Sequence, residues 1–487
     1  MKSHCLNLLL LVILAAGCLK NPSNQAVDPR LRVSQDGRYL VDEDGEPFFW
    51  MGGTAWGMAE WLKRGDVDDY LDDRAAKGFN LVQVCLFWGK REEDPVRFTT
   101  NPVNAYGHKA FVEVHGKPDP RQPWVVRGGT PQDPNDFWDH VDYIVQAAAE
   151  RNMMLALLPV WGRRYVNATH PPWSEPVFSI GDMRSYGRFL GERYRSSANI
   201  IWVLGGDVQA DAGGWFLDHY RSMAEGIITG ITGETVRWNE DSPLWDHALM
   251  TYHPDGSPLK NSSLWFHDDP WLDFNMIETH RHRDSVYRAV HSDYELSDPV
   301  KPTVMGEPDY EGARPNMVTA GIHIRRQALQ TYFAGAAGFT YGGKIDQDGN
   351  GPLWTPYRNW KAMLDMEGAR SMALIKSFCL DHYWPHWTPD QRIFISGMGE
   401  GENQKVAVFT IKDSTCLVYF PDSSAAELDL SDHFPGAGEL DVQWFNPASG
   451  IYAEKVAITS VEGRWPATPP SQWPDALLVI RSGYRKD

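Results

Sequence analysis

Eight short and almost uninterrupted apolar segments recur between residues 47 and 344, and stretches with helical character separate them. A strand that is buried on both faces has such a continuous apolar run, as in the parallel sheets of α/β proteins. Eight strand–helix repeats therefore predict an α/β fold, a (β/α)8 TIM barrel. The predicted strands are residues 47–56, 79–89, 153–162, 199–207, 248–254, 274–280, 302–307 and 338–344.

Helical stretches fill the gaps between these segments. Residues 67–77 end at Gly78, a residue type that commonly follows the last turn of a helix. The other predicted helices are residues 135–151, 183–194 and 320–334. The long second loop, residues 90–133, is rich in Pro, Gly and His, and such loops shape the substrate pocket of a barrel enzyme.

The two ends of the folded region have a different pattern. After residue 384, short strand-like segments such as VAVFTI, CLVYF and ALLVIRS alternate with Gly, Pro and Asp turns. This pattern predicts a small C-terminal antiparallel β-sandwich over residues 384–487. Residues 31–44 predict a β-hairpin that closes the barrel floor, so we assign residues 31–383 to the barrel.

The N-terminus has the features of an export signal. Residues 1–17 contain Lys2 and a short apolar run that ends in LAAGC, which resembles a bacterial lipobox with Cys18 as the lipidated residue. The run is too short to remain as a membrane-spanning helix. Residues 18–30 are polar, as in a tether. We expect an exported bacterial lipoprotein, in the periplasm or on the outer-membrane surface, that meets the membrane only through its lipid anchor. Ordinary signal-peptide cleavage is the alternative.

Composition limits the partners of the chain. A net charge of −18 argues against binding a nucleic-acid backbone, which requires clustered lysine and arginine. The 21 tryptophans suit the apolar faces of sugar rings, although tryptophan is equally a core residue. The remaining cysteines, Cys85, Cys379 and Cys416, form no disulfide framework or zinc motif. We expect an oligosaccharide or polysaccharide ligand and no cofactor; the oligomeric state stays open.

Two acidic residues stand where predicted strands end, which is where barrel enzymes have their active sites. Asp207 ends the fourth segment and Glu307 the seventh, and each follows a glycine. Glycosidic bond hydrolysis needs one protonated carboxyl as acid and one ionised carboxylate as nucleophile or base. A carboxyl separation of roughly 5–5.5 Å gives retention of configuration, and roughly 6.5–9.5 Å gives inversion. A single aspartate after a strand is more commonly a helix N-cap, but the pair favours catalysis.

Further polar and aromatic residues stand at the other strand ends. Their predicted role is to bind the substrate, and the alternative for each is a structural polar group or a core residue. Glu278 is also the reserve carboxylate if either main candidate fails. These residues are Trp56, Trp88, Trp161, His253, Glu278, His280, Tyr341 and Lys344.

A cluster of histidines after the sixth segment raises the question of a metal. His280 and His282 stand two positions apart near Asp284. Alternate residues of a strand point to opposite faces, and no HExxH or comparable ligand spacing is present. We therefore predict no metal site.

Four segments carry a resemblance to a known family: NIIWVLGGD, KPTVMGEPDYEG, FWMGGTAW and GFNLVQVCLFWG. They resemble bacterial proteins of domain of unknown function 4038, a group that includes glycoside hydrolase family 140. The resemblance covers residues 31–487, because that group has a similar C-terminal domain, labelled collagen-binding, with a segment like WFNPASG. It implies a retaining hydrolase that releases apiose-linked side chains from the pectin rhamnogalacturonan II, with Asp207 as acid/base and Glu307 as nucleophile.

One departure concerns the wider group of clan A hydrolases, which have Asn-Glu after the fourth strand. This chain has Gly206 and Asp207 there, so the asparagine that would contact the sugar 2-hydroxyl is missing. Family 140 resembles this chain in having Gly-Asp, so the departure weakens only the wider analogy. Two rival functions remain, a non-catalytic glycan-binding surface lipoprotein and a metal-dependent hydrolase. The presence of both acids favours the glycosidase.

Overall fold

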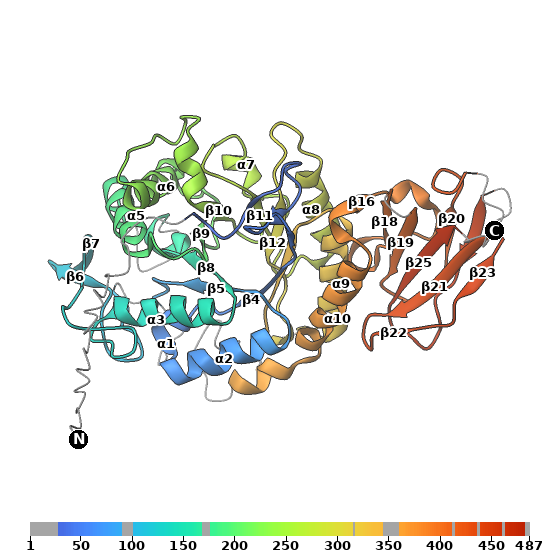
Figure 1. Ribbon diagram of the computed structural model, residues 1–487, viewed down its shortest axis with the longest axis horizontal. Coiled ribbons are helices and arrows are strands. Elements are labelled where there is room, and N and C mark those ends of the chain that lie inside the picture. The colour runs from blue at the N-terminus through green and yellow to red at the C-terminus, as the bar shows by residue number, and fades with distance from the viewer. Residues whose placement is uncertain are drawn as a thin grey trace, which may run out of the picture.

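The computed structural model describes most of the chain from residue 28 onward (Figure 1). Cys18, the predicted signal peptide and most of the predicted tether lie outside the described residues, as does Lys344. No helix in the described part is both long and apolar enough to cross a membrane. The described residues are 28–89, 101–167, 176–314, 317–343, 360–411, 414–435, 439–459 and 463–482.

An eight-stranded parallel sheet forms the centre of the larger part of the molecule (Figure 1). Its hydrogen-bonded order is β10-β9-β8-β5-β4-β15-β12-β11. The two end strands are joined by a bond from Thr251 Oγ1 to the Phe274 carbonyl (2.6 Å), so the sheet is nearly closed and fits a TIM barrel. The strands are β4 (Trp50–Thr54), β5 (Leu81–Cys85), β8 (Met154–Leu158), β9 (Ile200–Gly205), β10 (Leu249–His253), β11 (Asn275–Glu278), β12 (Thr303–Glu307) and β15 (Gly338–Tyr341).

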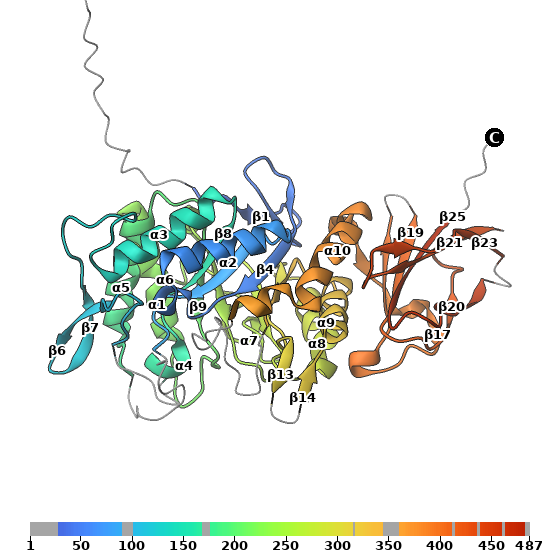
Figure 2. The same ribbon diagram turned by 90° about the horizontal axis from the view of Figure 1, so that it is seen from below.

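These strands are buried along their length, which explains their continuous apolar sequences. Helices follow them in sequence and cover the outside of the barrel (Figure 2). The helices are α1 (Met58–Trp61), α2 (Arg64–Ala76), α3 (Phe137–Glu150), α4 (Gly162–Tyr165), α5 (Ile180–Tyr194), α6 (Leu217–Thr232), α7 (Ser263–Phe266), α8 (Val286–Tyr294), α9 (Gly321–Phe333) and α10 (Glu367–Asp381).

Three segments differ from the sequence prediction. The predicted first strand is divided, because β3 (Pro47–Phe48) pairs with β2 (Leu40–Val41), which also pairs with β1 (Arg32–Val33), in a separate three-stranded sheet. The predicted hairpin therefore gains a third strand. In the second loop, β6 (Phe111–Val114) and β7 (Lys117–Pro123) form an antiparallel hairpin far from the C-terminal sheets (Figure 2).

Antiparallel sheets form the C-terminal part. The larger sheet has the order β16-β18-β19-β25-β21-β22, with β23 also paired to β21, and the smaller has the order β17-β20-β24. Buried residues of both sheets share one hydrophobic cluster, which includes Val418 and Leu428. The strands are β16 (Thr388–Pro389), β17 (Phe394–Ser396), β18 (Val406–Thr410), β19 (Thr415–Phe420), β20 (Ala426–Asp429), β21 (Leu440–Asn446), β22 (Ile451–Tyr452), β23 (Val456–Ile458), β24 (Arg464–Ala467) and β25 (Ala476–Ser482).

The larger sheet is buried on its other face as well, because it packs against the barrel. Leu417 and Tyr419 belong to the barrel's hydrophobic cluster, whereas their neighbours Cys416 and Val418 belong to the C-terminal cluster. Helices α9 and α10 lie between the barrel and this sheet in both views (Figures 1 and 2). The two parts of the chain are thus joined by a continuous apolar contact.

Candidate active site

Asp207 follows β9 in a turn that depends on glycine. Gly205, Gly206 and Asp207 have φ angles of 93°, 116° and 51°. A Cβ atom on Gly206 would lie 3.1 Å from both the Gly162 nitrogen and the Trp161 ring. Aspartate tolerates the left-handed region better than most residues. The turn therefore requires glycine at position 206 and brings the Asp207 side chain to the C-terminal end of the barrel strands.

Arg163 is the charged partner of Asp207. Its guanidinium lies 2.7 Å from the Asp207 carboxylate, and the Arg163 backbone N–H donates to the Gly206 carbonyl (3.1 Å). The Asp207 side chain is 28 % exposed, so it is open to a ligand. Burial of its surroundings raises the pKa of Asp207 above its ordinary value; Arg163 opposes this rise, and the charge of Glu307 adds to it. The two acids therefore influence each other's ionisation.

Glu307 ends β12 and is buried, with only 4 % of its side chain exposed. The Tyr310 hydroxyl donates to one of its oxygens, and Tyr310 in turn accepts from Trp56 Nε1 (3.0 Å). His253 Nε2 lies 3.1 Å from the other oxygen. Burial alone would raise the pKa of Glu307, but His253 and Tyr310 hold it below its ordinary value. Glu307 is therefore an ionised carboxylate at neutral pH.

His253 ends β10 and connects the acids of three strands. Its Nδ1 atom lies 2.9 Å from the Pro254 carbonyl, 3.4 Å from the backbone nitrogen of Asp207 and 3.7 Å from Glu278 Oε2. Nε2 faces Glu307, but without the alignment of a hydrogen bond. A buried imidazole in this position holds the Glu307 carboxylate next to the Asp207 turn.

Glu278 is the third buried carboxyl of this centre. It ends β11, and its pKa is raised well above the ordinary value by burial and then by the charges of Glu307 and Asp207. Burial and the neighbouring acids therefore favour the protonated form of Glu278. Within the described residues its Oε2 atom has no hydrogen-bond partner. A neutral carboxyl in this state can donate a hydrogen bond to a ligand.

The three predicted tryptophans surround this centre but offer no exposed platform. Trp56, Trp88 and Trp161 are 0 %, 1 % and 3 % exposed. The Trp161 ring packs edge-on against Trp56 (5.3 Å between centroids) and Trp88 (4.3 Å), and Trp56 packs against His253 (5.3 Å). Their main role is packing. Trp161 Nε1 is buried and has no hydrogen-bond partner within the described residues, so this atom can still meet a ligand.

The comparisons with known proteins agree with this geometry. Residues 34–386 match the family model described as "Apiosidase-like, catalytic domain". The chain belongs to the apiosidase-like family. A search of curated proteins finds no match.

Solved structures of similar fold are glycoside hydrolases. One, described simply as a glycoside hydrolase, is 26 % identical with a TM-score of 0.74, over 96 % of this chain and 98 % of that one. A glycoside hydrolase family 5 protein from Bacteroides vulgatus is 25 % identical with a TM-score of 0.76, over 95 % of each chain. This apiosidase-like chain is therefore a glycosidase, which binds a saccharide substrate.

The remaining predicted site residues within the described part of this apiosidase-like chain are His280 and Tyr341. The predicted sixth strand is too long, because β11 ends at Glu278 and His280 lies in a turn with φ of 45°. His280 nevertheless helps to lower the pKa of Glu307, after the larger effects of burial, His253 and Tyr310. The Tyr341 side chain is buried and its hydroxyl donates to Glu311 (2.7 Å), so a substrate contact of Tyr341 stays a prediction.

Sequence reasoning missed Tyr310 and two arginines. Arg163 and Arg164 follow the third predicted strand, and a basic pair at a strand end was a usable signal. Arg164 is buried, donates to the Trp88 carbonyl (2.9 Å) and lies over the Trp88 ring at 4.5 Å. Burial lowers the pKa of Arg164 to about 10. Buried Glu60 accepts the Trp88 N–H (2.6 Å), so Arg164 and Glu60 bond this segment from both sides.

A metal could be considered at one place within the described residues. Ligand atoms of His253, Glu278 and Glu307 lie within 4.8 Å of one another. Histidine nitrogen and carboxylate oxygen are both atom types that bind zinc in proteins. A metal bound here would have to displace the proton of Glu278, whose pKa is raised by burial and by the neighbouring acids.

Proposed function

We propose that Asp207 is the acid/base and Glu307 the nucleophile of a retaining glycosidase that cleaves a pectic glycan of the plant cell wall. The observation that carries this proposal is the opposite displacement of two pKa values in one centre. The pKa of Asp207 is raised by burial, and that of Glu307 is lowered by His253 and Tyr310. Catalysis of this kind needs one protonated and one ionised carboxyl.

The first half of the reaction forms a glycosyl–enzyme. Glu307 attacks the anomeric carbon while Asp207 gives its proton to the departing oxygen, so the glycosidic bond breaks as the ester bond forms. In the second half, Asp207 takes a proton from water, the water oxygen attacks the same carbon, and Glu307 leaves. Arg163 stabilises Asp207 while it is an anion between the two halves.

Other residues of the centre position the reacting groups. His253 and Tyr310 hold Glu307 ionised and oriented. Glu278 and Trp161 supply hydrogen-bond donors for sugar hydroxyls, since the raised pKa of Glu278 favours its protonated form and Trp161 Nε1 is unpaired within the described residues. Lys344, which lies outside the described residues, is proposed to meet an acidic sugar.

The proposed substrate is an apiose-linked side chain of rhamnogalacturonan II. The match to an apiosidase-like catalytic domain over residues 34–386 supports this choice. We further propose that the protein is exported and anchored through a lipid on Cys18, in the periplasm or on the outer-membrane surface. The apolar run that ends in LAAGC and the polar residues after it support the anchor.

The test of the catalytic pair is Asp207→Asn and Glu307→Gln, assayed on rhamnogalacturonan II oligosaccharides. Each variant should lose at least about a hundredfold in kcat. Exposed acids of the same types provide matched controls, Asp381→Asn and Glu439→Gln. Product NMR at early times should show the same anomeric configuration as the substrate. Normal turnover in both site variants, with native circular dichroism, would reject the assignment.

A metal-dependent hydrolase is the rival that one observation favours, the grouping of His253, Glu278 and Glu307. The proposed carboxyl mechanism predicts that turnover survives prolonged dialysis against EDTA. Loss of turnover that zinc restores would support the rival instead. The further alternative, a glycan-binding lipoprotein without catalysis, predicts saturable binding with no released sugar from any pectic oligosaccharide.

A further inference from the structure

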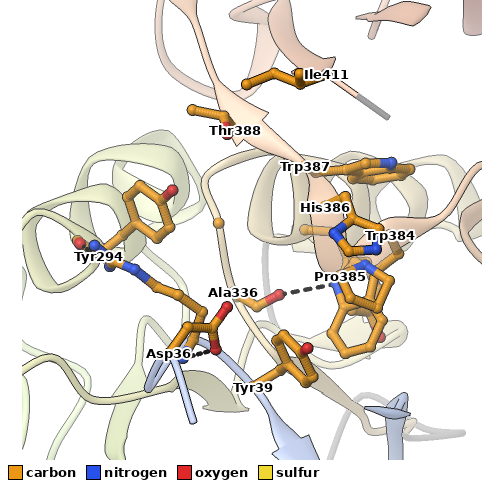
Figure 3. A pocket seen from close by; sticks show the side chains of 13 residues that line it. Asp36, Tyr39, Tyr294, Ala336, Trp384, Pro385, His386, Trp387, Thr388 and Ile411 are labelled. Carbon is orange, nitrogen blue, oxygen red and sulfur yellow. Dashed lines mark hydrogen bonds between the residues drawn. The ribbon is translucent and has the colours of Figure 1, made fainter. Parts of the chain in front are cut away.

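A second pocket lies where the barrel floor meets the C-terminal sheets (Figure 3). Its volume is about 290 Å³. Six parts of the chain line it: the β1–β2 turn, helix α8, Tyr332 at the end of helix α9, the segment before β15, the segment from Trp384 to Thr388, and Ile411 after β18. It is therefore built jointly by the barrel and the C-terminal part. Its volume suits a ligand of one or two sugar rings.

This pocket is remote from the proposed catalytic centre. Gly335 and Ala336 precede β15, and the β1–β2 turn precedes β4, so the pocket lies at the N-terminal ends of the barrel strands. Asp207 and Glu307 stand at the opposite, C-terminal ends. A ligand in this pocket does not reach the catalytic carboxyls.

Aromatic side chains form the walls, and their positions are held by bonds within the protein. Tyr294 lies across the pocket from His386 and Trp384, with Ala336 between them (Figure 3). Trp384 Nε1 donates to the Ala336 carbonyl (3.3 Å), and the Trp384 ring packs edge-on against Tyr39 at 5.9 Å. These walls are therefore formed before any ligand binds, which reduces the entropy cost of binding.

Arg38 holds the Tyr294 wall in place. Its guanidinium lies over the Tyr294 ring at 4.2 Å and donates to the Tyr294 carbonyl. Asp36 Oδ1 accepts from Ser34 Oγ (2.6 Å) and from the Arg38 N–H (3.1 Å). Asp36 and Arg38 are the charged groups of the lining, and their charges cancel.

Hydrogen-bonding groups at the pocket remain unused within the described part of the chain. They are the hydroxyls of Tyr39 and Tyr294, the imidazole of His386 and the second oxygen of Asp36. Fixed aromatic walls with a few such groups match the two sides of a sugar, its apolar C–H face and its hydroxyls. An apolar ligand would leave these groups without partners.

We propose that this pocket is a non-catalytic binding site for a neutral saccharide unit. The cancelled charge disfavours uronic acids, because the only guanidinium of the lining is already engaged by Tyr294. The site would hold a glycan chain against the barrel floor at a distance from the catalytic centre. Binding here does not require the chemistry at Asp207 and Glu307.

The test is a ligand-observed NMR titration of the full chain with methyl glycosides of arabinose, rhamnose and galactose, and with galacturonate as the charged comparator. Two variants address the pocket. Tyr294→Ala removes one wall, and Thr388→Trp fills the space without removing a wall. Tyr452→Ala is the matched control, because Tyr452 is a partly exposed aromatic residue outside the pocket.

The expected result is saturable binding of at least one neutral glycoside, weakened about tenfold or more in both pocket variants and unchanged in the control. Glu307→Gln should bind this glycoside as the wild type does, which keeps the result separate from the catalytic proposal. Absence of binding by all three neutral probes would overturn the inference. So would tighter binding of galacturonate, or unchanged affinity in Thr388→Trp.

Discussion

Two groups of buried ionisable side chains in this molecule differ in how completely they are hydrogen-bonded. At the contact between barrel and C-terminal part, Arg325 on α9 meets Asp475 through Nε (2.9 Å) and Nη2 (3.0 Å). Asp475 also accepts from the Tyr419 hydroxyl (3.1 Å). In the central group, by contrast, His253 Nε2 and the Oε2 atoms of Glu278 and Glu307 have no aligned partner within the described residues.

The difference distinguishes a structural from a functional use of charge. A buried ion needs its full set of bonds to offset its desolvation, and the Arg325 group has them. The central group keeps unsatisfied atoms at the C-terminal end of the barrel, where a sugar can supply the missing bonds. Changes in the first group should therefore alter stability, and changes in the second should alter catalysis.

The largest expected effect is on turnover in Glu307→Gln. We expect kcat to fall at least about a hundredfold, while the free energy of unfolding falls by no more than about 2 kcal/mol. Glutamine keeps the volume and can still accept the Tyr310 hydrogen bond, so the packing is preserved. Parallel kinetics and urea unfolding measure both quantities. A large loss of stability would remove the distinction between the two groups.

The reverse pattern is expected for Asp475→Asn. The substitution removes the buried carboxylate partner of Arg325 and leaves only the half-exposed Glu367 to balance its charge. Because a wholly uncompensated buried charge costs about 3–5 kcal/mol, we expect a loss of about 2–3 kcal/mol in the free energy of unfolding. Asp441→Asn is the control, because the Asp441 carboxylate lies at a partly exposed surface position, 3.6 Å from Lys455. Urea unfolding gives the difference. The activity of the molecules that remain folded should equal that of the wild type, and a loss of kcat instead would contradict the structural role.

A smaller effect is expected on the pH dependence of Arg163→Gln. Arg163 lowers the pKa of Asp207, so its removal raises that pKa further. The alkaline limb of kcat/KM, where Asp207 loses its proton, should move to higher pH by up to about one unit, since a part-exposed pair contributes roughly 1 kcal/mol. The acid limb, set by Glu307, should stay. Arg184→Gln is the control, as this arginine pairs with Glu225 on the outer helices.

Much of the barrel could be predicted because burial on both faces leaves a mark in sequence. All eight apolar segments contain a strand of the central sheet, and Glu307 stands at the predicted end of one. The short pairing of Pro47–Phe48 could not be predicted, because edge pairing depends on where the β1–β2 turn lies in space. The segment that contains Leu417 and Val418 is also continuously apolar, because both faces of its strand are buried. Leu417 packs in the hydrophobic cluster of the barrel, and Val418 packs in the C-terminal cluster.

The site was only partly predictable for a physical reason. A strand end can be located from a pattern, but the partners of a side chain come from segments far away in sequence. Trp56 is buried by Trp161 and His253, and no local feature separates such a residue from an exposed platform. Tyr310 lies three positions after Glu307, within a loop without periodicity, so its bond to the carboxylate follows from the folded backbone alone.

The smallest expected effect concerns Glu278→Gln, in the same buried group as Glu307. Burial and the neighbouring charges raise the pKa of Glu278 well above its ordinary value, which favours the protonated form, and glutamine has the charge and shape of that form. The amide can still donate a hydrogen bond to a sugar, so kcat should fall by less than about tenfold.

The same substitution at Glu278 and at Glu307 should thus differ in effect by at least about tenfold, although the two residues are of one type and lie in one group. A metal mechanism predicts otherwise, because Glu278→Gln would remove an anionic ligand from the set of His253, Glu278 and Glu307. Rate measurements on both variants at pH 7, before and after EDTA dialysis, compare the two mechanisms directly. Equal losses of a hundredfold would show that Glu278 acts as an ion, and the assignment of acid and nucleophile would then have to include it.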